Sequence, residues 1–179
     1  PIPRRQRQMC IRDRMNIAKG LTNGAIPMGA VLTSAEIYRS MMAMDIPEHM
    51  IELPHGYTYS AHPVACAAAL AALNVFQDDQ MVAKAQALAP VLEETLHSLR
   101  DHPHITDIRN FGLAGALQIA PRDGDPVIRP FELGIKCWEM GLYVRWGGDT
   151  LQFGPPFTAD QEDVRSIATI VGAALEQVS

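Results

Sequence analysis

The sequence has few cysteines and no long apolar run. Its three cysteines, Cys10, Cys66 and Cys137, lie far apart, which fits neither a disulfide framework nor a CxxC metal site and suits a reducing cytoplasm. A membrane span needs about 18 consecutive apolar residues, whereas the most apolar stretch, 64–76, is Ala-rich and interrupted by Asn74. No signal peptide is visible. We therefore expect a cytoplasmic protein without membrane contact, and a buried helix at 64–76.

Several widespread catalytic motifs are also missing. There is no HExxH zinc signature, no GxxxxGK[ST] phosphate loop and no GxSxG nucleophile elbow. The segment Asn110–Gly115 is not GxGxxG, and no acidic residue follows at the spacing of a dinucleotide site. These absences argue against a zinc protease, a P-loop enzyme, a serine hydrolase and a dinucleotide-dependent enzyme.

Charge is unevenly distributed along the chain. The net charge is -5, yet residues 1–14 contain five arginines and only one acid, Asp13. The rest of the chain is acidic, shows no interleaving of aromatic and basic residues, and has no recognisable nucleic-acid motif, so no nucleic-acid partner is expected. Residues 1–14 resemble foreign sequence joined to a fragment, and we interpret them as a non-native basic segment outside the fold.

From Met15 onward, hydrophobic periodicity and capping residues predict alternating strands and helices. Ser34, Pro63 and Thr158 are expected at helix starts, and Gly141 at a helix end. Residues 104–179 thus resemble a small α+β domain that follows part of something larger. The expected strands are a short buried one at 16–19 and others at 30–32, 105–109, 113–120, 142–145 and 151–153. The expected helices are 36–44, 63–76, 80–100, 131–140 and one after 158.

Lys19 is the first residue that suggests chemistry. It follows an apolar run and precedes Gly20, so the aliphatic part of its side chain would be held in place while its amine faces an open loop. A lysine near buried surface loses its charge more readily and can attack a carbonyl. The alternative is an ordinary solvated lysine at a strand end.

A hydroxyl-rich loop, His55–Pro63, is the second candidate. It leads into a helix N-terminus, where free N–H groups, the helix dipole and the Thr58 hydroxyl together suit a phosphate group. The alternative is that Thr58 and Ser60 only cap the helix.

Arg145 is the third candidate. It lies at the expected end of an apolar strand and before Gly147-Gly148. A guanidinium there could take a carboxylate through two hydrogen bonds. The alternatives are an ion pair with Asp149 or a side chain left in water.

Three segments, in this order, carry a resemblance to a known family. Ile17–Ala30 (IAKGLTNGAIPMGA) resembles the lysine segment of class III aminotransferases that depend on pyridoxal phosphate (PLP). His55–Pro63 resembles their phosphate-binding loop, and Tyr143–Asp149 resembles their substrate-arginine segment. Within the class, 22–29 and 148–155 most resemble the enzymes that act on ω-amino acids with pyruvate.

The resemblance implies roles for the three residues. Lys19 would hold PLP as a Schiff base and move the proton between substrate and cofactor. Thr58 would bind the PLP phosphate in the neighbouring subunit's site, which implies a homodimer or a dimer-based tetramer. Arg145 would hold the substrate carboxylate. The activity implied is transfer of an amino group from an ω- or β-amino acid, or an amine, to pyruvate, giving alanine.

The fold implied is α/β, the fold type I of PLP-dependent transferases. Residues 15–80 would form the C-terminal part of the large PLP-binding domain, 81–103 a connecting helix and 104–179 the small domain. The family places an aspartate about 30 residues before its lysine, so we interpret the chain as a fragment and expect it to be inactive alone. The open alternatives are another class III PLP enzyme, such as an aminomutase or decarboxylase, and a non-catalytic α+β binding module.

Overall fold

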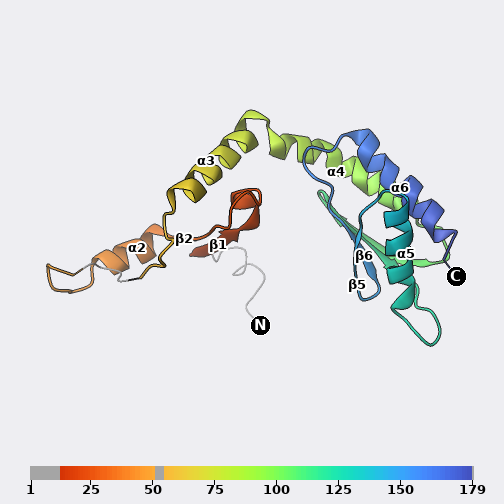
Figure 1. Ribbon diagram of the computed structural model, residues 1–179, viewed down its shortest axis with the longest axis horizontal. Coiled ribbons are helices and arrows are strands. Elements are labelled where there is room, and N and C mark those ends of the chain that lie inside the picture. The colour runs from red at the N-terminus through yellow and green to blue at the C-terminus, as the bar shows by residue number, and fades with distance from the viewer. Residues whose placement is uncertain (1–12, 51–54, 179) are drawn as a thin grey trace. The chain divides into compact units, whose positions relative to one another are not determined.

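The computed structural model describes residues 13–50 and 55–178, which form two compact units (Figure 1). The first unit ends at Asp78 and the second begins at Asp79. Most of the basic segment expected at 1–14 lies outside the described residues. None of the helices in the described ranges is both long and apolar enough to cross a bilayer.

The first unit is a two-stranded antiparallel ribbon followed by two helices. The strands pair with Ile17 opposite Ala30, which confirms the two strands expected here. The Ser34 hydroxyl accepts a hydrogen bond from the Ile37 N–H, so Ser34 caps its helix as expected. The elements are β1 Arg14–Ala18, the short helix η1 Lys19–Leu21, β2 Gly29–Thr33, α2 Ala35–Met42 and α3 Pro63–Asp78.

Two burial predictions for this unit are wrong. Strand β1 was expected to be buried, yet only Ile17 in it is even half-buried. Helix α3 was expected to be buried, yet only Ala65 and Ala69 are. In the described residues β1 pairs with β2 alone, and a two-stranded ribbon has too little area to cover an apolar helix. The large apolar side chains that remain exposed on α3 are Val64, Leu70, Leu73, Val75 and Phe76.

The second unit is a four-stranded antiparallel sheet with three helices on one face (Figure 1). The strand order is β3-β4-β6-β5, so the last hairpin supplies one edge of the sheet. The whole chain from residue 79 is part of this unit, and the assignment of 81–103 as a connecting helix stays a prediction. The elements are α4 Met81–His97, β3 Ile105–Phe111, β4 Ala114–Ile119, α5 Ile128–Glu139, β5 Arg145–Gly147, β6 Thr150–Phe153 and α6 Gln161–Leu175.

The core of the second unit lies between the sheet and the three helices. Leu117 of β4 and Leu151 of β6 are fully buried, whereas Gln152, the next residue in β6, is exposed. Because successive side chains of a strand point to opposite faces, one face of the sheet is apolar and covered and the other is polar and open. The helices contribute Leu92 and Leu96, Leu133 and Cys137, and Val164 and Val171 to this core.

Two expected boundaries in this unit are wrong. Asp160, not Thr158, caps the last helix: its carboxylate accepts from the N–H groups of Glu162 and Asp163, and the Asp163 carboxylate accepts from the Asp160 N–H. Both side chains of this capping box are ionised carboxylates, which stabilise a helix N-terminus more than a single hydroxyl does. Arg145 begins β5 rather than ending a strand, since residues 142–144 are not in a strand.

Gly134 of α5 provides the space for Trp146 of β5. A Cβ atom added at Gly134 would lie 2.4 Å from Cε3 of the indole, a rigid ring that also contacts Phe131 edge-on. We expect Gly134→Ala to lower the free energy of unfolding by about 1–3 kcal/mol, because overpacking outweighs the gain in helix propensity. Thermal or urea unfolding measures this change in the free energy of unfolding.

Gly172 of α6 is the matched control. A Cβ atom there would lie 3.5 Å from Leu99 Cδ2, an ordinary contact. Gly172→Ala should therefore stabilise by up to about 1 kcal/mol. Equal stability of the two variants would contradict the close approach of Trp146 to α5.

Candidate functional site

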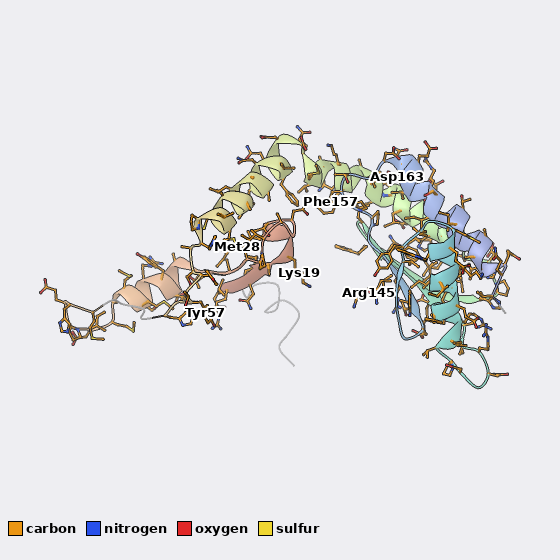
Figure 2. The ribbon with its side chains drawn as sticks, in the orientation of Figure 1. Lys19, Met28, Tyr57, Arg145, Phe157 and Asp163 are labelled. Carbon is orange, nitrogen blue, oxygen red and sulfur yellow. The ribbon has the colours of Figure 1, made fainter. Side chains whose placement is uncertain are left out.

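Lys19 lies at the junction between β1 and η1, with an exposed side chain (Figure 2). Within the described residues its amine makes no hydrogen bond or ion pair. Its backbone has φ 57°, a left-handed conformation that is unfavourable for a residue with a Cβ atom. Such strained positions concentrate at functional sites, so the strain favours a functional reading of Lys19 over that of an ordinary strand end.

The loop after Lys19 is closed by a buried threonine. Thr22 is 3% exposed, and its hydroxyl donates to the Ile26 carbonyl at 2.6 Å. Asn23 and Gly24 also adopt positive φ, 50° and 76°. The loop therefore has a defined conformation, set by its own residues, which returns the chain from Lys19 to β2.

A cavity of about 500 Å³ joins the lysine segment to the hydroxyl-rich loop. Its wall is formed by Ile26–Gly29 of the first segment and by Tyr57 and Tyr59–His62 of the second, together with Ala65 of α3. Figure 2 labels Met28 and Tyr57, one from each segment. Two stretches that are about 30 residues apart in the sequence thus form one hollow, although neither Lys19 nor Thr58 lines it.

Thr58 lies in the turn that precedes α3, with an exposed side chain. The Tyr57 N–H donates to the Ser60 hydroxyl at 2.9 Å, and Ala61 has φ 56°. Thr58 itself makes no hydrogen bond within the described residues and lies five positions before Pro63, so it does not cap α3. The capping alternative is wrong for Thr58, and its hydroxyl is available to a ligand.

Arg145 lies on the polar face of the sheet, and Figure 2 shows it on the side opposite α5. It pairs across the hairpin with Gln152, while its neighbour Trp146 packs against the core. Gly147 is opposite Thr150, so Gly148 and Asp149 form a two-residue loop, with Gly148 at φ 59° as in a type II′ turn. The turn thus fixes the strand that bears the guanidinium.

Asp149, the expected rival partner of Arg145, is engaged elsewhere. Its carboxylate accepts from Gln118 Nε2 at 2.8 Å and from Thr150 Oγ1 at 2.8 Å. The hydrogen bonds from Thr150 and then Gln118 lower the pKa of the Asp149 carboxyl, so it is negatively charged at neutral pH. No ion pair joins it to Arg145 in the described ranges, which leaves the exposed guanidinium available to a carboxylate.

Sequence reasoning missed Gln118. It lies in β4, 31 residues before Asp149, and nothing in its local pattern distinguishes it from any other polar residue of a half-exposed strand. Only the pairing of β4 with β6 brings its amide to the turn. Lys19 and Thr58 belong to the first unit, and Arg145, Asp149 and Gln118 belong to the second.

Comparisons with known proteins agree with the family resemblance of the three segments. A sequence profile of the family described as "Aminotransferase class-III" matches residues 10–175. The chain is 57% identical over 167 residues to a beta-alanine–pyruvate aminotransferase of Pseudomonas aeruginosa, covering 93% of this chain and 37% of that protein. It is 55% identical over 166 residues to an omega-amino acid–pyruvate aminotransferase of Pseudomonas putida, with the same coverage.

Solved structures agree with these sequence relatives. An amine transaminase from an uncultivated Pseudomonas species, in a PLP-bound form, superposes with a TM-score of 0.81 at 30% identity, covering 93% of this chain and 39% of that one. A transaminase described under directed evolution by ancestral reconstruction superposes with a TM-score of 0.83 at 27% identity, covering 96% and 39%. The chain thus spans little more than a third of the proteins it is similar to.

Proposed function

Because the chain belongs to the class III aminotransferases, we propose that the protein of which it forms part moves an amino group from an ω- or β-amino acid, or an amine, to pyruvate. The observation that carries this proposal is the 57% identity to a beta-alanine–pyruvate aminotransferase over 93% of the chain. The alternative of a non-catalytic binding module has no such support. The chain has the fold type I of PLP-dependent transferases, as the transaminase structures confirm.

The residues present fit the PLP that this family uses. An aldehyde cofactor needs an amine that is free to condense with it, and the Lys19 amine is exposed and unpartnered within the described residues. A phosphate needs hydroxyl and N–H donors, and Thr58 offers an exposed hydroxyl with no partner among the residues that the structure describes. When bound, PLP supplies an electron sink for the substrate carbanion.

The three residues then have distinct tasks. Lys19 would hold the cofactor through its amine, and the same amine would remove and return the proton at the substrate carbon. Thr58 donates a hydrogen bond to a phosphate oxygen, in our proposal across the interface of a homodimer. Arg145 binds the carboxylate of pyruvate or of the amino acid through its planar pair of N–H donors.

The test uses the complete polypeptide encoded by the reading frame that contains these residues. With PLP the protein should be yellow, lose that colour when β-alanine is added, and form alanine when pyruvate follows. A yellow protein that makes no alanine from pyruvate would indicate another class III reaction, and a colourless one would refute the proposal.

The 179 residues alone are expected to show no transaminase activity, because they correspond to 37% of the length of their relatives. They also leave large apolar side chains of α3 exposed. Alanine formation from pyruvate and β-alanine by the purified chain would overturn this expectation.

A further inference from the structure

The tip of the hairpin that carries Arg145 is fastened to the neighbouring strand by Asp149. Besides the two hydrogen bonds to its carboxylate, its carbonyl oxygen accepts from the Ile119 N–H at 2.8 Å. Gln118 is itself held, since the Thr106 hydroxyl donates to the Gln118 carbonyl at 3.2 Å. The carboxylate of Asp149 therefore has a fixed direction, towards β4.

Without that fastening, Asp149 and Arg145 would be within reach of each other. A strand rises about 3.3 Å per residue, so Arg145 begins roughly 7 Å before the end of the hairpin ladder at Gly147. An extended arginine side chain spans a distance of this size. The polar face carries both groups, because the carboxylate reaches the side chain of Gln118 on that face.

An Arg145–Asp149 ion pair would compete with a substrate. Binding a carboxylate through both N–H groups of the guanidinium requires that the guanidinium have no internal partner. An exposed ion pair of this kind would weaken substrate binding by up to about fivefold.

We propose that Gln118 determines how tightly Arg145 binds a substrate carboxylate, because its amide holds Asp149 away from the guanidinium. This proposal rests on the proposed function, since it takes Arg145 as the carboxylate-binding residue. Gln118 is a positioning residue: it contacts Asp149 and acts on the substrate only through the two charged residues.

The other charges on this face are consistent with the assignment. Arg109 of β3 is paired with Asp107, with Nε and Oδ2 3.4 Å apart. The positive charge of Arg109 also helps to lower the pKa of Asp149, although no ion pair joins the two within the described residues. Gln118 is uncharged, so it binds the Asp149 carboxylate without adding a further cation to a face that already carries Arg109 and Arg145.

The experiment compares two amino acceptors in the complete polypeptide, pyruvate and a short aliphatic aldehyde. Gln118→Leu removes the 2.8 Å hydrogen bond and frees Asp149. We expect the KM for pyruvate to rise about threefold to fivefold, because an exposed ion pair changes a binding constant by a factor of about this size. The KM for the aldehyde, which has no carboxylate, and kcat with either acceptor should stay unchanged.

A double variant separates this effect from a general loosening of the hairpin. In Gln118→Leu combined with Asp149→Asn, the neutral amide cannot form an ion pair with Arg145, and we expect the KM for pyruvate to return to the value of the unaltered protein. Thr106→Val is the matched control: it removes the hydrogen bond to the Gln118 backbone and leaves Asp149 engaged. It should change neither KM.

The outcomes are distinguishable. Failure of the unaltered protein to use pyruvate would refute the proposed function. An active protein in which Gln118→Leu raises both KM values equally, or in which Asp149→Asn does not restore the KM for pyruvate, would refute the role of Gln118. If Gln118→Leu does not fold, Gln118→Ala removes the same hydrogen bond to Asp149 with a smaller side chain. The same pyruvate-selective rise is then expected, and its absence refutes the role.

Discussion

Replacement of Lys19 with alanine in the complete polypeptide is expected to abolish covalent attachment of PLP and to lower kcat by at least about 10²–10⁴-fold. That range is what a positioned proton-transfer group alone contributes, before the loss of attachment is counted. The physical reason is that the exposed amine of Lys19 is both the nucleophile and the base of the proposed reaction. Lys19→Arg keeps the charge but should lose the same activity.

Within these 179 residues the alternative attachment points are few, since the lysines are Lys19, Lys84 and Lys136. After reduction with borohydride in the presence of PLP, peptide mass mapping should find the modification on the peptide that contains Lys19. Lys84 is exposed on α4 and is the matched control, so Lys84→Arg should leave both the modification and kcat unchanged. Modification that persists in Lys19→Ala would show that another lysine carries the cofactor.

The positions of most elements could be predicted from the sequence because their signals are local. Ser34 starts a helix through its own hydroxyl, Pro63 occupies a first helical turn, and Gly141 follows a helix with φ 91°. The lysine and arginine segments could likewise be recognised from consecutive residues. Capping was harder where two candidates were close together, and Asp160 rather than Thr158 starts α6 because its carboxylate reaches two N–H groups.

What could not be predicted depends on contacts between distant residues. Burial of β1 and α3 was inferred from their apolar composition, but burial requires a partner surface, and composition does not state which residues supply it. The engagement of Asp149 depends on Gln118, 31 residues away, and on the strand order β4-β6-β5. Sequence reasoning therefore left the Arg145–Asp149 ion pair open as an alternative, and only the sheet register removed it.

Because the sheet register turns Asp149 away from Arg145, we expect a large loss of activity towards pyruvate when Arg145 is replaced. Arg145→Leu should lower kcat/KM for pyruvate about 10²-fold, because a charge-assisted pair of hydrogen bonds to a carboxylate contributes about 2–3 kcal/mol. Turnover of an aliphatic aldehyde acceptor should be unaffected, since that substrate has no carboxylate to bind. Arg145→Lys should recover only part of the loss, because an ammonium group lacks the planar fork of a guanidinium.

Arg109→Leu is the matched control for this substitution, since it removes the same charge from the same face of the sheet. Arg109 is already paired with Asp107, so its loss should leave kcat/KM for pyruvate within about twofold. Steady-state kinetics with both acceptors measures these differences. If Arg145→Leu and Arg109→Leu weakened pyruvate use equally, the effect would come from the general positive potential of the face. A fall in kcat/KM for pyruvate that is specific to Arg145→Leu fits a guanidinium that has no ion-pair partner among the described residues and binds the substrate carboxylate.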